Sequence, residues 1–206
     1  MAKRKKGGPD SLSTEEKIKA AARKVFLRKG FSATRTRDIA EEAGINLALL
    51  NYYFRSKQKL FEEVMKEKIQ TLLQTIIPVL NNPSTSLEKK IEQVVSNYIE
   101  VLLANNDLPI FVLNELRKDN TKFITNVPIQ KVIFQSSFMT QLKEQRDDIN
   151  PIHFLISLLG MTIFPFVAKP ILTQSGLVNE KNFQSLMKER ESLIPIWMTT
   201  ILKAKL

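Results

Sequence analysis

The chain has 206 residues, and its 43% hydrophobic and 25% charged residues are typical of a globular protein. The absence of Cys excludes disulfides and thiolate metal sites, and His153 is the only His, so we expect no metal and no cofactor. The basic N-terminus, MAKRKKGGPD, lacks the apolar run of a signal peptide. The longest apolar stretch, residues 152–167, is shorter than the roughly 18–20 uninterrupted residues of a membrane span, so we expect a soluble cytoplasmic protein with no membrane partner.

The formal net charge of +10 lies almost entirely in the first third of the chain. Residues 1–60 contain 15 Lys and Arg against 6 Asp and Glu, whereas residues 61–206 contain 16 against 15. This concentration favours a polyanionic partner, because neutralised phosphates release their condensed counterions. Two alternatives stay open at this point: a solvated basic face without a partner, and an anionic membrane surface.

The first predicted helix follows a tail. Residues 1–11 are rich in Lys, Gly, Pro and Ser, which indicates a disordered segment. Apolar residues then recur at helical spacing from Ser13 or Thr14 to Lys29. Gly30 follows, at the position where a left-handed residue ends a helix.

Two short helices and a longer one are predicted next. We expect Thr34 to cap the second helix, which ends at Gly44, and Asn46 to cap a third helix that runs to Tyr53. Ser56 is expected to cap the fourth helix.

The rest of the chain is predicted to be helical as well. Pro78 and the Asn81–Pro83 run should break the chain, and Pro195 should kink or divide the last helix. There is no internal repeat and no alternating strand pattern, so the sequence predicts an all-α fold. Five further helices are predicted. The first starts at residue 84 or 86 and runs to residue 102, and the others cover residues 111–118, 129–147, 152–164 and 179–203.

Residues 34–57 have the pattern of a helix-turn-helix. Two short helices, Arg35–Ala43 and Asn46–Tyr53, are joined by a tight turn at Gly44 and Ile45, and the first helix braces them. In such a motif the second helix of the pair enters the major groove of double-stranded DNA, while the first crosses the backbone.

The groove helix should be short and should carry small and polar side chains on its outer face. An Asn can pair with adenine, and Leu and Ala can touch a thymine methyl group. The candidate base contacts are Asn46, Leu47, Ala48 and Asn51.

Side chains suited to phosphate surround this helix, and contacts of that kind fix register without reading the sequence. Taken singly, a Tyr is as often a half-buried core residue and an Arg or Lys is usually solvated, so the prediction depends on their joint placement. Leu49 and Leu50 are expected in the core. The candidate phosphate contacts are Thr34, Arg35, Arg37, Tyr52, Tyr53 and Lys57.

Three stretches of this region, AARKVFLRKGFSAT, RDIAEEAGI and NYYFRSKQKLF, resemble the N-terminal domain of the TetR family of bacterial regulators. The resemblance covers residues 12–66 and fades after about Glu67. It implies dimeric DNA binding and a divergent C-terminal domain that binds a small molecule or forms the dimer. Asn51 departs from the Tyr that is common in the family as a phosphate contact, so the resemblance assigns that role to Tyr53 instead.

The predicted organisation is a disordered basic tail over residues 1–11, a helix-turn-helix domain over residues 12–66, and a ligand-binding and dimerisation domain over residues 67–206. In the family the last two helices usually form the dimer; the alternative is that they belong to the internal core. The candidate interface residues are Ser157, Gly160, Leu186, Leu193, Trp197 and Ile201.

A ligand pocket is predicted in the same domain, because such pockets are mostly apolar with a few polar groups. Each candidate taken alone is more often an ordinary core residue than a pocket residue. The candidate pocket residues are Tyr98, Phe111, Asn114, Phe134, Phe138 and Met139.

The sequence thus predicts a homodimeric repressor that binds a pseudo-palindromic operator and is released by an unknown small-molecule effector. The alternative is a DNA-binding regulator or activator of the same family without an effector. No phosphate-binding Gly loop, nucleophile elbow or zinc motif is present, so we do not expect an enzyme.

Overall fold

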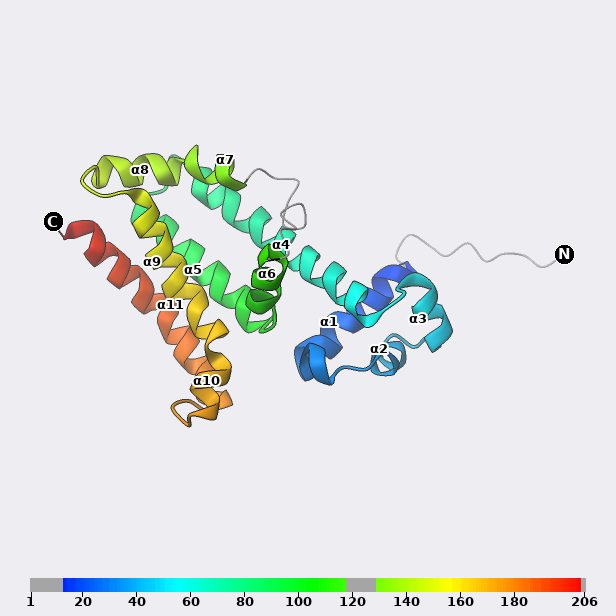
Figure 1. The fold of residues 1–206 in the computed structure, drawn as a ribbon. Coiled ribbons are helices and arrows are strands. Elements are labelled where there is room, and N and C mark those ends of the chain that lie inside the picture. The colour runs from blue at the N-terminus through cyan, green and yellow to red at the C-terminus, as the bar shows by residue number, and fades with distance from the viewer. Residues whose placement is uncertain (1–12, 118–128, 205–206) are drawn as a thin grey trace. The chain divides into compact units, whose positions relative to one another are not determined.

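The computed structural model describes residues 13–117 and 129–204, which form helices joined by turns and contain no strand (Figure 1). The predicted all-α fold is confirmed for these residues, while the predicted tail and the loop before Pro128 lie outside them. None of the described helices combines the length and the apolar character needed to cross a membrane. In chain order the helices are α1 (Thr14–Ala33), α2 (Thr36–Glu42), α3 (Leu47–Tyr53), α4 (Lys57–Asn81), α5 (Leu87–Leu103), α6 (Leu108–Arg117), α7 (Ile129–Phe134), α8 (Ser137–Gln145), α9 (Pro151–Val167), α10 (Lys169–Gln174) and α11 (Glu180–Lys203).

The chain divides into two compact units between Met65 and Lys66. The first unit contains α1, α2, α3 and the beginning of α4, and the second contains the rest of α4 together with α5 to α11.

A capping box begins α1 in the first unit. The Glu16 backbone N–H donates to the Ser13 hydroxyl at 3.2 Å, and the Ser13 N–H donates to the Glu16 carboxylate at 2.9 Å, which satisfies two donors that the helix cannot. The bond from the Ser13 backbone lowers the pKa of Glu16. Gly30, with φ of 72°, breaks the regular geometry of α1, which continues to Ala33. The predicted helix end is therefore a break within α1.

The inner faces of the first unit form an apolar core. Short polar segments connect the helices. Within each helix the buried positions follow the helical spacing of its apolar residues. The rings of Phe26 and Phe61 pack edge to face at 5.0 Å and join α1 to α4. The core side chains are Ile18, Ala22, Val25, Phe26, Ile39, Ala40, Leu50, Phe54, Leu60 and Phe61.

The second unit is built around three helices in mutual contact, α5, α9 and α11 (Figure 1). The Ser86 side chain caps α5, and the Asn179 side chain caps α11. Helix α8 packs on α5 and α9, and α6 packs on α9. The most deeply buried apolar side chains of this core include Leu87, Ile91, Ile99, Phe138, Met139, Phe154, Phe183, Ile194 and Met198.

A buried lysine ties α5 to α8. Lys90 is fully buried, and its ammonium donates to the Ser137 hydroxyl at 2.8 Å and to the Gln141 side-chain oxygen at 2.7 Å. Burial lowers the pKa of Lys90, since its partners here are neutral. The Gln141 amide in turn donates to the Thr85 carbonyl at 3.0 Å.

Prolines lie inside helices where the sequence predicted breaks. Helix α4 passes through Pro78, so the break predicted there is wrong, and α11 passes through Pro195 without being divided in two. A proline removes one N–H and leaves the carbonyl four residues earlier without its helical partner. In α9 that carbonyl is the one of Met161, four residues before Pro165, and the Arg190 guanidinium of α11 donates to it at 2.7 Å.

The segment predicted as one helix over residues 129–147 is two helices, α7 and α8. The Ser136 hydroxyl accepts from the Met139 N–H at 3.2 Å and starts α8 afresh. A serine at an N-cap offers the backbone an alternative to helix continuation, which the apolar spacing did not indicate. Helix α10 was not predicted either.

Candidate DNA-binding site

The turn between α2 and α3 has a defined end and a defined start. The Ile45 N–H donates to the Ala40 carbonyl and the Gly44 N–H to the Glu41 carbonyl, both at 3.0 Å, which is a Schellman arrangement. Gly44 has φ of 66°, a conformation that L side chains rarely adopt. The predicted helix-turn-helix geometry is therefore present.

The outer face of α3 is accessible. Leu50 is fully buried and anchors the helix, whereas Ala48 and Asn51 are exposed and Leu47 is half-buried. Leu49 is 36% exposed, so the prediction that it lies in the core is wrong. Leu49 is therefore a surface residue, unlike its neighbour Leu50, and the apolar pattern of the sequence did not indicate this.

The Asn46 side chain caps α3 and is also a candidate base contact. Its amide oxygen accepts from the Leu49 N–H at 2.8 Å and so caps α3, as predicted. Its amide N–H groups have no partner among the described residues and can donate to a base acceptor. A pairing that also needs the oxygen would share that atom with the cap.

Basic and aromatic side chains flank this face. Arg35 and Arg37 are exposed, at the start of α2. Tyr52 is 80% exposed and Tyr53 is 41% exposed, and their rings meet edge to face at 5.5 Å. Four of the six residues that the sequence predicted as phosphate contacts are thus on the surface.

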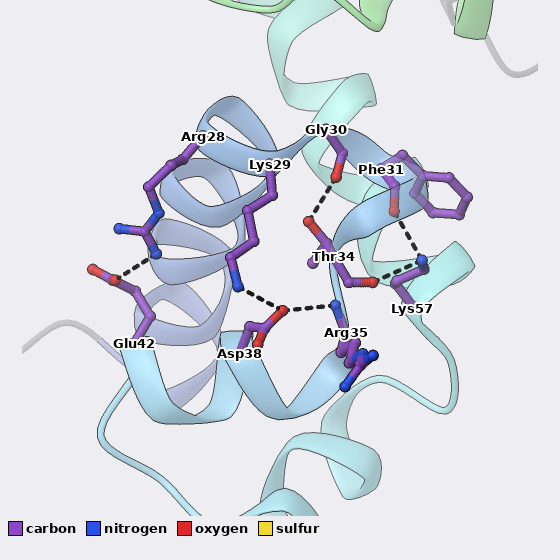
Figure 2. A network of polar contacts seen from close by, with 9 residues as sticks. All are labelled: Arg28, Lys29, Gly30, Phe31, Thr34, Arg35, Asp38, Glu42 and Lys57. Atoms are coloured by element: carbon purple, nitrogen blue, oxygen red, sulfur yellow. Dashed lines mark hydrogen bonds and ion pairs between the residues drawn. The ribbon is translucent and has the colours of Figure 1, made fainter.

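The other two, Thr34 and Lys57, are used inside the protein (Figure 2). Thr34 is 2% exposed, and its hydroxyl donates to the Gly30 carbonyl at 2.7 Å. It does not cap α2, as the sequence predicted, because it ends α1. The N-cap of α2 is Arg35, whose N–H donates to the Asp38 carboxylate at 2.9 Å. The Lys57 ammonium donates to the Phe31 and Thr34 carbonyls, each at 2.8 Å.

Ion pairs that the sequence did not indicate join α1 to α2 (Figure 2). Lys29 lies 3.1 Å from Asp38, and Arg28 lies 3.6 Å from Glu42. The N–H of Arg35 and then the Lys29 ammonium hold the pKa of Asp38 below its ordinary value. Such exposed pairs contribute little energy singly, but together they orient α2 on α1.

The predicted pocket residues lie in different environments. Phe111, Phe138 and Met139 are buried, whereas Asn114 and Phe134 are on the surface. Burial raises the pKa of the Tyr98 hydroxyl.

A surface groove lies elsewhere, between α5 and α11, and has a volume of about 720 Å³. Its lining mixes charged, hydroxyl and apolar side chains. The lining includes Lys89, Glu92, Gln93 and Ser96 of α5 and Glu191, Ser192, Pro195, Ile196, Thr199, Thr200 and Lys203 of α11.

The predicted interface residues lie on α9 and α11, which contact one another. Leu186, Leu193 and Trp197 are between 36% and 39% exposed, and Gly160 is exposed as well. Ser157 and Ile201 are half-buried, at the margin of this face.

The geometry of α1, α2 and α3 agrees with a known family. Residues 18–64 match the family model described as bacterial regulatory proteins, tetR family. This match identifies the N-terminal helices as the DNA-binding domain of the TetR family. Members of this family are transcription regulators with a helix-turn-helix DNA-binding domain, which identifies the motif at α2 and α3.

Two curated relatives extend the similarity beyond this domain. The Probable HTH-type transcriptional regulator YttP of Bacillus subtilis is 27% identical over 93% of this chain and 95% of its own length. The HTH-type transcriptional repressor KstR2 of Mycolicibacterium smegmatis is 27% identical over 63% of this chain and 70% of its own length.

Solved structures share the fold. The fatty acid degradation regulator FadR from Bacillus halodurans superposes with a TM-score of 0.61 at 18% identity, over 92% of this chain and 96% of that one. The regulator FadR from Bacillus subtilis, solved in complex with stearoyl-CoA, gives a TM-score of 0.55 at 18% identity, over 87% and 96% of the two chains.

The cap of α3 gives a prediction about stability. Asn46→Ala removes the acceptor of the Leu49 N–H and should lower the free energy of unfolding by about 1 kcal/mol, whereas Asn46→Ser keeps an acceptor and should cost much less. Asn51→Ala, on the same helix without a cap bond, is the control. Urea unfolding measures all three, and equal losses in the Ala and Ser variants at position 46 would contradict the assignment of the cap.

Proposed function

We propose that this TetR-family regulator is a cytoplasmic homodimeric repressor that binds a pseudo-palindromic operator and leaves it when a small-molecule effector binds. The observation that carries the DNA-binding part is the accessible outer face of α3, flanked by Arg35 and Arg37. The positive charge of residues 1–60 supports the same partner, since DNA binding gains from counterion release.

Within this interface the roles divide by chemistry. Leu47, Ala48 and the exposed Leu49 offer apolar contacts to thymine methyl groups, and the Asn46 amide offers N–H donors. Asn51 is exposed on the same helix and stays a candidate for the bases.

The proposed phosphate contacts are the exposed cations and phenols around α3. Arg35 and Arg37 supply charge-assisted hydrogen bonds, and Tyr52 and Tyr53 supply hydroxyl donors. Thr34 is not part of this proposal, because its hydroxyl is buried and already donates to Gly30.

Two variants separate base contacts from phosphate contacts. Arg37→Ala should weaken binding to all DNA sequences alike and should reduce the slope of log K against log salt by about 0.9, because one fewer counterion is released. Leu47→Ala should change which sequence is preferred. Selection from random DNA, followed by titrations at several salt concentrations, measures both. Equal losses on selected and random DNA for both variants would contradict the assignment of Leu47.

Dimerisation is supported by an apolar face on α9 and α11. Ile156, Phe164 and Ile196 are 63%, 66% and 60% exposed, beside the smaller exposures of Leu193 and Trp197. An exposed apolar surface of this kind marks an interaction site. A second copy fits it, because a two-fold axis brings the same patch of each subunit together.

Ile156→Glu tests this interface. A charge in the middle of the apolar face should shift the dimer to monomer, since the carboxylate would lose its water on association. Sedimentation velocity at micromolar concentration measures the shift. Leu113→Glu is the matched control, because Leu113 is 46% exposed on α6, outside the face, and its substitution should leave the dimer intact. A monomeric wild type, or equal effects of both substitutions, would contradict the proposed face.

The proposal of a repressor with an effector has two supports. The relative KstR2 is a transcriptional repressor by name, and the fold neighbour from Bacillus subtilis was solved with stearoyl-CoA. This chain offers the groove between α5 and α11 and, as the sequence proposed, the interior around Tyr98, Phe111 and Phe138.

Stearoyl-CoA is therefore the first compound to test on the protein–operator complex. Coupling of order 1–3 kcal/mol would weaken operator binding by about 5- to 150-fold at saturation. Fluorescence anisotropy with labelled operator measures the release. A response lost in Ser96→Trp would locate the ligand in the groove, and a response kept there would favour the interior residues. No release by stearoyl-CoA or by a broad metabolite panel would favour the alternative, a regulator or activator without an effector.

A further inference from the structure

Lys57, the first residue of α4, makes three contacts within the first unit (Figure 2). Its ammonium donates to the Phe31 carbonyl and to the Thr34 carbonyl, each at 2.8 Å, and lies 4.3 Å from the centre of the Phe31 ring. An ammonium has three N–H donors and no acceptor, so two oxygens and one ring face account for all of them.

The two carbonyls need a donor because of how α1 ends. Gly30 breaks the helix, and in a continued helix the Phe31 carbonyl would accept from the Arg35 N–H. That N–H donates instead to the Asp38 carboxylate, and the backbone bond from the Thr34 N–H to the Phe31 carbonyl is long, at 3.3 Å. Carbonyls at the C-terminal end of a helix carry partial negative charge, which a cation satisfies best.

One turn further along α4, Phe61 holds the same residue by its ring. The rings of Phe31 and Phe61 lie 4.6 Å apart, and Phe61 packs in turn on Phe26 at 5.0 Å. Residues four apart lie on one face of a helix, so Lys57 and Phe61 both contact Phe31 from the same face of α4. The backbone and the side chain of Phe31 are therefore both fixed to α4.

The segment held in this way leads directly into the DNA-binding groups. Thr34 is followed by Arg35 and Arg37, which are exposed at the start of α2. The position of these arginines relative to α4 thus depends on the connection that Lys57 holds.

We propose that Lys57 is a positioning residue for DNA binding: it fixes the connection between α1 and α2 to α4, and it does not contact phosphate. The proposal rests on the proposed DNA interface only for its effect on affinity, since the positioning itself is a property of the free protein. A phosphate could engage the Lys57 ammonium only by displacing a carbonyl or the Phe31 ring, which would leave a backbone acceptor unpaired.

Lys57→Met keeps the aliphatic stem and removes the charge and the donors. We expect it to weaken DNA binding by about tenfold, because Arg35 and Arg37 lose their fixed position. Arg37→Ala is the matched control: it should weaken DNA binding as well, but it leaves the contacts of the Lys57 ammonium in place. Wild-type affinity for the selected DNA in Lys57→Met would overturn the proposal.

Hydrogen exchange of the full-length protein without DNA gives the second measurement. Amides of residues 31–36 should exchange at least tenfold faster in Lys57→Met than in the wild type, and at the wild-type rate in Arg37→Ala. Unchanged exchange in Lys57→Met would also overturn the proposal, whether or not the wild type binds the selected DNA.

Phe31→Leu serves if Lys57→Met does not fold. It removes the ring and keeps both carbonyls, so we expect faster exchange over residues 31–36 in the protein without DNA. Amide exchange at the wild-type rate in Phe31→Leu would contradict the proposal, which requires that the contacts of the Phe31 ring with α4 hold this segment in place.

Discussion

The broken end of α1 is the constraint on which the first unit depends. A helix end leaves carbonyls without partners, and the positive φ of Gly30 places such carbonyls next to the start of the helix-turn-helix. The Thr34 hydroxyl satisfies the Gly30 carbonyl, and the Lys57 ammonium satisfies those of Phe31 and Thr34. Thr34 belongs to the connection between α1 and α2, whereas Lys57 belongs to α4. The carbonyls at the end of α1 are therefore satisfied partly by a tertiary contact.

The helices that follow are delimited in the same way, by polar groups that satisfy the backbone. The Asp38 carboxylate accepts from the Arg35 N–H at the start of α2, and the Asn46 amide oxygen does the same for α3. The Schellman arrangement at Gly44 closes the end of α2 between them. Seven-residue helices are too short to be stable alone, so α2 and α3 also depend on the packing of Ile39, Ala40 and Leu50 in the core.

The second unit also contains a helix carbonyl without a helical donor, and its partner comes from another helix. Pro165 leaves the Met161 carbonyl without a helical donor, and Arg190 supplies one from α11. The same guanidinium lies 5.3 Å from the ring centre of Trp197, on the exposed side of α11. A single arginine of α11 therefore bonds to α9 at the carbonyl that Pro165 leaves without a helical donor.

The sequence by itself determined the helical class, the helix-turn-helix and the start of α3 at Asn46, because these depend on local spacing and on local caps; for α1 and α5 it left two adjacent or nearby cap residues open. It identified Arg35, Arg37, Tyr52 and Tyr53 as surface candidates from their type and place in the motif. Only the tertiary structure decided that Thr34 and Lys57 face inward and Leu49 outward, and that α4 and α11 continue through Pro78 and Pro195. The physical reason is that a side chain's partner can lie far away in sequence. The carbonyls that Lys57 satisfies are 26 and 23 residues distant, and the donor for Met161 is 29 residues distant, beyond any local pattern.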